Sequence, residues 1–362
     1  MKGQLRVLVV NPFGIGDAIF SLSLVESLRA ARPEAFIGFL CNERTAALVR
    51  LDPSIDRTYV FHRDRYRKLW KKHPLLFWRK LSAFLGLLKE DRFDCLIDLS
   101  LGRQYAFFAA AIGIGARVGF DFRGRGTFLT KKVPLAGYRD RHVADTQRDL
   151  LRLLGVDAPA PVSRLPLRVP APAAAAAESF LKKNRIGPSD RVLAVAPGGG
   201  KTWGRDAVYK QWAPERFASL AAELARRKGF RVLVVGDRGE APLLEAVARD
   251  ASRGAAAAAV AAGEPIEVVA ALLSRSRLFI GNDGGILHLA NALGVPSVSF
   301  YGPVDERVYG PYGTETPHAV LTAGVPCRPC YKDFRFPPCP HERRCLEEIS
   351  VEKAVEIAEN IA

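Results

Sequence analysis

The first half of the chain alternates short apolar runs with longer stretches that have helical spacing. Residues 5–10 form an apolar run that ends at an Asn-Pro pair, as a buried strand before a loop does. In residues 21–31, leucine and valine recur every three or four positions, which predicts an amphipathic helix. Further strands are predicted at residues 35–40, 58–61, 94–99 and 117–120. This order predicts a parallel sheet covered by helices on both faces.

The second half repeats this order and adds glycine and acidic residues at the ends of its strands. Strands are predicted at residues 192–196, 231–235, 278–280 and 297–300, and helices at 214–228 and 351–361. In parallel α/β sheets, ligands bind at the loops that follow the strands. The predicted fold class is therefore α/β, with candidate sites at the strand ends of both halves.

A proline-rich stretch separates the halves. Residues 159–172 lead into five consecutive alanines, a composition typical of a linker that enters a helix. The length of 362 residues suits two domains. We predict an N-terminal Rossmann-like domain, a linker, a C-terminal Rossmann-like domain and a terminal helix, at residues 1–168, 169–178, 179–349 and 350–362.

The net charge of the chain indicates which class of partner it binds. A formal net charge of +15 favours an anionic partner: nucleic acid, an anionic membrane surface or a phosphorylated substrate. With 48% hydrophobic residues, the chain is not of the disordered class. The sequence shows neither a secretory signal nor a run of about 18 apolar residues. We therefore expect a cytoplasmic protein, soluble or peripheral to a membrane.

The loop after the first strand is a candidate ligand site. Its sequence, NPFGIGD at residues 11–17, opens a helix. Gly14 and Gly16 would let a ligand approach the backbone closely, and a helix N-terminus favours an anion. The loop is not a dinucleotide fingerprint, because Ile19 stands where the third glycine belongs. Asp17 is either a helix-capping carboxylate, which is the more common role, or a catalytic base.

Three loops of the second half combine glycine with charged residues. Consecutive glycines after the strand at 192–196 present amides that can cradle a diphosphate, and an acid after the next strand can bind ribose hydroxyls. Paired glycines before a helix form a third pocket for an anion or a sugar. Taken singly, each loop also fits a plain turn, and a lone histidine is more often packed than catalytic. The residues are Gly198, Gly199, Gly200, Lys210, Glu240, Asp283, Gly284, Gly285 and His288.

Residues 63–80 combine basic and aromatic side chains. Arg63, Arg65 and six further lysines and arginines surround Trp70, Phe77 and Trp78. This mixture suits an anionic membrane interface, single-stranded nucleic acid, or a solvated helix with buried aromatics. Of the three, we favour membrane contact.

Four of the six cysteines lie close to the C-terminus. In a cytosolic chain disulfides are disfavoured, and four thiolates predict a tetrahedral site for zinc or iron. No open ligand position is apparent, so the predicted site is structural. Its ligands would be Cys327, Cys330, Cys339 and Cys345.

Together these motifs resemble glycosyltransferase family 9, the ADP-heptose:lipopolysaccharide heptosyltransferases, over essentially the whole chain. The resemblance is strongest in GIGDAIFSLSLVESLR (14–29), KQWAPERFASLAAEL (210–224) and NDGGILHLANALGVPSVSFYGPVD (282–305). It implies the GT-B fold, in which two Rossmann-like domains face each other across a cleft. It also implies an inverting transfer of heptose from ADP-heptose to a lipid-anchored, phosphorylated inner-core glycan, without a catalytic metal.

The resemblance also implies roles for individual residues. Asp17 matches the acidic residue proposed as general base, Lys210 matches a lysine that neutralises the donor phosphates, and Glu240 resembles the residue that holds the ribose. The rest of the donor side would be Gly198, Gly199, Gly200, Asp283, Gly284, Gly285 and His288. The acceptor side would be Gly14, Gly16, Arg63 and Arg65. The family commonly has Asp-Thr-Gly where this chain has Asp-Gly-Gly at 283–285.

The expected partners are a nucleotide-sugar donor, an anionic glycolipid acceptor and the inner face of the cytoplasmic membrane. Nucleic acid is disfavoured because no binding module for RNA or DNA is recognisable. Two alternatives stay open. One is another nucleotide sugar used for a different surface glycan or a protein acceptor, and the other is a sugar-nucleotide epimerase of the same fold.

Overall fold

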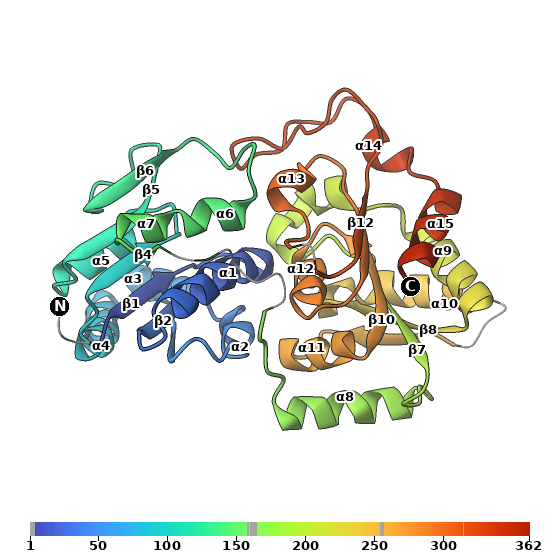
Figure 1. Ribbon diagram of the computed structural model, residues 1–362, viewed down its shortest axis with the longest axis horizontal. Coiled ribbons are helices and arrows are strands. Elements are labelled where there is room, and N and C mark those ends of the chain that lie inside the picture. The colour runs from blue at the N-terminus through green and yellow to red at the C-terminus, as the bar shows by residue number, and fades with distance from the viewer. Residues whose placement is uncertain (1–3, 158, 160–164, 254–256, 314) are drawn as a thin grey trace. The chain divides into compact units, whose positions relative to one another are not determined.

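The computed structural model describes residues 4–157, 159, 165–253, 257–313 and 315–362. The chain divides into two compact units, residues 1–162 and 163–362. Each unit contains a six-stranded parallel sheet with helices packed on its faces (Figure 1). The predicted α/β class with two Rossmann-like domains is confirmed.

The first unit has the sheet order β3-β2-β1-β4-β5-β6. Its strands are β1 (Arg6–Val10), β2 (Phe36–Cys41), β3 (Arg57–Val60), β4 (Cys95–Asp98), β5 (Ala116–Phe122) and β6 (Lys131–Leu135). Its helices are α1 (Ile15–Ala31), α2 (Ala46–Val49), α3 (Arg63–Lys72), α4 (Pro74–Glu90), α5 (Gln104–Ala111), α6 (Val143–Arg148) and α7 (Leu150–Leu153).

Strand β1 shows why this sheet needs helices on both faces. Successive side chains of a strand point to opposite faces. Leu8 and Val10 join a core cluster that includes Leu81 of α4 and Tyr105 of α5. The alternate residues of β1 are buried as well, on the opposite face of the sheet. The run is therefore apolar throughout, as is typical of a central parallel strand.

The second unit has the sheet order β12-β11-β10-β7-β8-β9. Its strands are β7 (Arg191–Ala196), β8 (Phe230–Gly236), β9 (Ala259–Ala262), β10 (Ser276–Asn282), β11 (Ser297–Phe300) and β12 (His318–Leu321). Its helices are α8 (Ala171–Lys183), α9 (Pro214–Lys228), α10 (Ala241–Ala251), α11 (Ile266–Ser274), α12 (Gly285–Ala292), α13 (Glu306–Tyr309), α14 (Arg344–Glu347) and α15 (Val351–Ile361), with 3₁₀ segments at Lys201–Lys210 and Arg238–Glu240.

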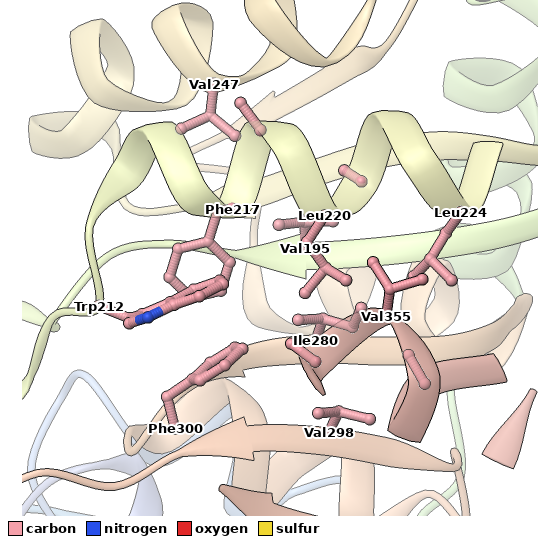
Figure 2. Packing of buried hydrophobic residues seen from close by; sticks show 14 of the residues in the cluster. Val195, Trp212, Phe217, Leu220, Leu224, Val247, Ile280, Val298, Phe300 and Val355 are labelled. Carbon is pink, nitrogen blue, oxygen red and sulfur yellow. The ribbon is translucent and has the colours of Figure 1, made fainter. Parts of the chain in front are cut away.

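Trp212 occupies the core of the second unit between sheet and helices (Figure 2). Its ring stacks on Phe300 of β11, with centroids 4.0 Å apart, and meets Phe217 of α9 edge-on at 5.1 Å. The indole N–H donates to the Ile349 carbonyl at 3.1 Å, so the polar end of the buried ring is satisfied. Trp212 thus joins α9, β11 and the segment before α15.

The two sheets have the same strand order when each is numbered from its own first strand: 3-2-1-4-5-6. In this order the connections run in opposite directions from the two central strands, and ligands bind at the carboxyl ends beside that switch point. The switch point lies between β1 and β4 in the first unit and between β7 and β10 in the second. Three of the predicted strand-end loops, those after β1, β7 and β10, lie at a switch point.

Three strands that the apolar pattern does not predict are β6, β9 and β12, and each lies at an edge of its sheet. An edge strand pairs on one side only and needs less apolar surface. The sequence of β6, KKVPL, is largely polar at its start and contains a proline, and that of β9, AVAA, is mostly alanine, which is depleted in strands.

The stretch predicted as a linker is mostly helical: α8 covers residues 171–183. The predicted domain limits at residues 168, 178 and 349 stay predictions. Among the described residues, no helix is long and apolar enough to cross a membrane.

A buried carboxyl group in the first unit links stability to pH. Asp52 is 2% exposed, and one of its oxygens accepts the Ser54 N–H at 2.9 Å. Burial, reinforced by the charge of Glu26, raises the pKa of Asp52 from 3.8 to about 8. The folded state therefore keeps a proton that the unfolded state releases, and the contribution of Asp52 to stability falls as pH rises from about 4 to about 8.

We predict that Asp52→Asn raises the melting temperature at pH 8 but not at pH 4, because the amide is neutral at both. Each kcal/mol gained should raise Tm by about 2–4 °C. Thermal unfolding of both proteins across this pH range measures the effect. A Tm difference that does not change with pH would contradict the prediction.

Candidate active site

The side chain of Asn282 organises the carboxyl edge of the second sheet. It ends β10 and is 3% exposed. Its Nδ2 donates to the carbonyls of Pro197 at 2.8 Å and Gly198 at 3.3 Å. Its Oδ1 accepts the Trp212 N–H at 2.9 Å. One amide therefore joins the ends of β7 and β10 to the segment that follows Lys210.

The glycine loop after β7 fits closely around Glu240. The Glu240 carboxylate accepts the Gly200 N–H at 3.3 Å and the Asp237 N–H at 3.0 Å, which connects the loops after β7 and β8. A Cβ atom at Gly198 would meet that carboxylate, so a side chain there would displace Glu240 from the loop. Gly200 has a φ of +79°, a backbone conformation that favours glycine.

Lys210 and Asp283 form a buried ion pair on the same edge. Lys210 Nζ lies 2.7 Å from Asp283 Oδ2, and the side chains are 5% and 6% exposed. His288 Nε2 is 3.9 Å from Asp283 Oδ1. Tyr301 is fully buried beside the pair, and burial together with the Asp283 charge raises the pKa of its hydroxyl well above the ordinary value. The cation is thus held in place by a carboxylate, in surroundings that water does not screen.

Two glycines lead from this ion pair into α12. Gly284 is the residue before the helix and Gly285 its first residue. The first amides of a helix have no partner within it and point toward the side from which an anion would approach. The N-terminus of α12 therefore lies on the same sheet edge as the glycine loop.

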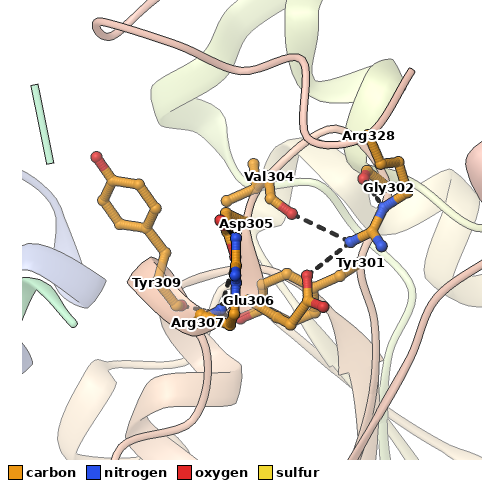
Figure 3. Close-up of polar contacts among 8 residues, drawn as sticks. All are labelled: Tyr301, Gly302, Val304, Asp305, Glu306, Arg307, Tyr309 and Arg328. Atoms are coloured by element: carbon orange, nitrogen blue, oxygen red, sulfur yellow. Dashed lines mark hydrogen bonds and ion pairs between the residues drawn. The ribbon is translucent and has the colours of Figure 1, made fainter. Parts of the chain in front are cut away.

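Arg328 connects the cysteine-rich segment, residues 327–345, to the loop after β11 through hydrogen bonds and an ion pair (Figure 3). Its guanidinium donates to the carbonyls of Gly302 and Val304 and lies 2.7 Å from Glu306 Oε2. The Cys330 N–H donates to the Pro303 carbonyl at 3.0 Å. These contacts hold the loop after β11 from outside the sheet.

The loop after β1 in the first unit is held by two asparagines. Asn11 Nδ2 donates to the Asp17 carbonyl at 3.0 Å, and Asn42 Nδ2 donates to the carbonyls of Pro12 and Phe13. The Asp17 carboxylate, in the first turn of α1, accepts the Gly14 N–H at 3.3 Å. Asp17 therefore does cap the helix, and it is half-buried at the switch point of its sheet.

Asp98 is a second carboxyl group at this switch point, and the sequence analysis did not identify it. It ends β4, beside β1, and is 3% exposed. One oxygen accepts the Ser100 N–H at 2.9 Å, and among the described residues the other has no hydrogen-bond partner. Burial raises the pKa of Asp98 to about 6. Its signal in the sequence is an acid that follows a short apolar run.

The predicted acceptor-side cations lie on α3. Arg63 and Arg65 are exposed and belong to the first turn of the helix that follows β3. They share the first unit with Gly14, Gly16 and Asp17.

The prediction of a structural zinc or iron site at the four cysteines needs correction. All four cysteines line one small pocket. Within the described ranges, however, no group of three or more His, Cys, Asp or Glu side chains is arranged to hold a metal ion. Cys345 belongs to the hydrophobic core cluster, and burial raises the pKa of its thiol to about 11 and also raises that of Cys330.

The predicted donor-side residues all belong to the second unit, and the predicted acceptor-side residues belong to the first. The carboxyl edge of the second sheet carries Gly198, Gly199, Gly200, Lys210, Glu240, Asp283, Gly284, Gly285 and His288. Asn282 and Trp212, which position this group, lie within the predicted motifs but were not predicted as site residues. A signal was present, because an asparagine follows an apolar strand directly in Gly281-Asn282.

Comparison with known proteins identifies a family. The sequence model for glycosyltransferase family 9 (heptosyltransferase) matches residues 82–335. The chain is 26% identical to lipopolysaccharide heptosyltransferase 1 of Pseudomonas aeruginosa, over 95% of this chain and 91% of that protein. It is also 26% identical to lipopolysaccharide heptosyltransferase 1 of Escherichia coli, over 85% of this chain and 91% of that protein.

Solved structures show the same fold. A family 9 glycosyl transferase from Veillonella parvula superposes with a TM-score of 0.78 and 23% identity, covering 100% of this chain and 98% of that one. The E. coli heptosyltransferase WaaC with ADP gives a TM-score of 0.72 and 21% identity, covering 99% and 100%. These likenesses show that the chain has the GT-B fold.

We predict that Asn282→Ala lowers the free energy of unfolding by about 2–3 kcal/mol, because it leaves the Trp212 N–H and the Pro197 carbonyl buried without partners. Chemical denaturation measures the change. The matched control is Asn184→Ala, which removes a partly exposed bond to the Phe180 carbonyl and should cost less than about 1 kcal/mol. If both variants lost the same free energy of unfolding, the Asn282 hydrogen bonds would contribute no more to stability than an ordinary surface hydrogen bond.

Proposed function

Because the chain belongs to glycosyltransferase family 9, the heptosyltransferase family, we propose that it transfers heptose from ADP-heptose to a lipid-anchored, phosphorylated inner-core glycan of lipopolysaccharide. The relatives described above are lipopolysaccharide heptosyltransferases. WaaC has also been solved with ADP-2-deoxy-2-fluoro heptose. The observation that carries the proposal is the buried Lys210–Asp283 pair at the switch point of the second sheet.

The donor diphosphate is proposed to bind at the carboxyl edge of the second sheet. Lys210 would neutralise the negative charge that grows on the leaving diphosphate, assisted by backbone amides of the glycine loop and of the α12 N-terminus. Asp283 supports this role because it holds the ammonium group before any ligand arrives. A cation fixed in advance loses little free energy to reorganisation during the reaction.

Glu240 is proposed to contact the donor ribose. Acids that follow the second strand of such sheets commonly accept hydrogen bonds from ribose hydroxyls. In support, Glu240 follows β8, the second strand of its unit, and its carboxylate lies against the glycine loop.

The acceptor hydroxyl is proposed to be activated by Asp17. The carboxylate takes the hydroxyl proton while the acceptor oxygen attacks the anomeric carbon. The bond from that carbon to the diphosphate oxygen breaks, and ADP leaves with the electron pair. A single displacement of this kind inverts the anomeric centre. Gly14, Gly16, Arg63 and Arg65 would contact the acceptor, and the two arginines would meet its phosphates.

The reaction is proposed to need no catalytic metal, because Lys210 and the backbone amides supply the positive charge that a divalent cation would otherwise provide. Calorimetry without added magnesium, and with a chelator present, tests the donor. The panel is ADP-heptose, ADP, a UDP-sugar and a GDP-sugar. Selective binding of ADP and ADP-heptose is expected. Preferential binding of the UDP-sugar or the GDP-sugar would leave the fold and the proposed mechanism standing but would overturn the assignment of ADP-heptose as the donor.

We predict that Asp17→Ala lowers the rate of transfer by about 10²–10⁴-fold, the usual contribution of a general base. Donor affinity should stay unchanged, since Asp17 belongs to the other unit. Transfer is followed as ADP release with acceptor present. The control is Glu352→Ala, which removes an exposed first-turn acid of α15. If Asp17→Ala loses stability but keeps its rate, Asp17 is only a helix cap.

We predict that the double variant Lys210→Met/Asp283→Asn weakens donor binding by about 10- to 100-fold, the worth of a hydrogen bond to a charged group. Changing both partners avoids leaving a buried carboxylate unpaired. The matched control, Arg227→Met/Glu223→Gln, removes an exposed ion pair of α9 and should leave donor affinity unchanged. Wild-type affinity in the Lys210 variant would refute the phosphate assignment.

A further inference from the structure

Helices α3 and α4 form a hairpin that is attached to the first unit along one side. His73 alone separates the two helices. No residue of α3 is buried, and α4 buries Leu81 and Leu88 in its later turns. The end of the hairpin near His73 therefore has little cover from the rest of its unit.

The base of the hairpin, the part away from His73, is packed against the first unit by aromatic side chains. Phe61 stacks on Tyr66 of α3 with centroids 4.6 Å apart and meets Phe84 of α4 at 5.4 Å. The Tyr66 hydroxyl donates to the Lys80 carbonyl at 3.2 Å, which joins the two helices. The hairpin therefore has a fixed base on the β3 side of the sheet.

The tip of the hairpin exposes large apolar side chains. Leu75 is 87% exposed, Trp78 57% and Trp70 53%. The two tryptophans lie 6.0 Å apart and both contact Phe77, so they form one cluster. A lone exposed leucine needs no explanation, but two exposed tryptophans in one cluster mark an interaction surface, and Leu75 lies on the same exposed tip.

The hairpin that carries this cluster is strongly basic. Residues 63–80 contain eight lysines and arginines and a single acid, Asp64. Within the described part of the chain, no ion pair is found for any of the eight. Their charge therefore faces solvent and is available to an anionic partner.

We propose that the tip of this hairpin docks on an anionic phospholipid bilayer. Trp70 and Trp78 would lie at headgroup level, as tryptophans do at membrane interfaces, and Leu75 would enter the acyl boundary. The basic side chains would face anionic headgroups. A bilayer explains the tip better than single-stranded nucleic acid does, because bases stack on aromatic faces and leave an 87% exposed leucine without a role.

The proposal extends the proposed function by naming the surface on which a lipid-anchored acceptor would be met. It is tested without donor or acceptor, by flotation with vesicles of phosphatidylcholine alone or mixed with phosphatidylglycerol. We expect binding only to the mixed vesicles, and a loss of binding as salt is raised, because salt screens the headgroup charge. Equal binding to both vesicle types, or to neither, would overturn the proposal.

Leu75→Glu tests the contribution of the tip. The affinity for mixed vesicles should fall at least about tenfold, because burial of the leucine side chain is lost. The fold should survive, since Leu75 is in the first turn of α4, where a negative charge is favourable. The matched control is Leu87→Glu on the same helix, 44% exposed and 12 residues from Leu75. Unchanged binding in Leu75→Glu, or an equal loss in Leu87→Glu, would overturn docking through the tip.

Two further measurements separate the outcomes. Tryptophan fluorescence should shift to the blue on mixed vesicles, and this shift should be lost in Trp70→Phe/Trp78→Phe. Binding of an oligonucleotide without binding of vesicles would assign the hairpin to nucleic acid instead. Calorimetric donor binding should be the same in Leu75→Glu and wild type, so failure of the docking proposal and failure of the donor assignment are distinct results.

Discussion

The hydrogen bonds of the Asn282 amide are the interaction on which the carboxyl edge of the second sheet depends. They join the glycine loop after β7 to the Trp212 backbone. The Trp212 ring in turn fills the core against Phe300. Lys210 precedes Trp212 by two residues, so the packing of the core also fixes where the Lys210 ammonium meets Asp283. The cation that the proposed reaction needs is thus positioned by apolar packing and by one buried amide.

The same carboxyl edges show how one residue serves both structure and chemistry. Asp17 caps α1, and Glu240 joins two loops. A carboxylate already held by backbone N–H groups has a fixed direction, which is what a base or a ribose contact requires. Asp17 can therefore cap the helix and also act as the general base. The basic side chains of the chain also occur in two different environments. Lys210 is buried and paired with Asp283, whereas the lysines and arginines of the α3–α4 hairpin are exposed.

The cysteines show the limit of reasoning from residue type. Four thiols within a short stretch resemble a ligand set, and all four do line one cavity. Cys345, however, packs into the core next to Leu346, where a protonated thiol behaves as a small apolar side chain. Spacing along the chain does not show whether four thiols coordinate a metal or pack separately, because the tertiary fold decides whether their sulfur atoms converge on one point.

The sequence by itself determined the α/β class, the central strands and the loops that end them, since a strand buried on both faces must be apolar throughout. It also pointed to Asp17, Lys210 and Asp283 by motif. It did not predict β6, β9 and β12, because edge strands need little apolar surface. Only the tertiary structure decided that Lys210 pairs with Asp283, that Asn282 bridges β7 and β10, and that Leu75 stands exposed. These facts depend on contacts between residues far apart in the chain, and no local pattern records such contacts.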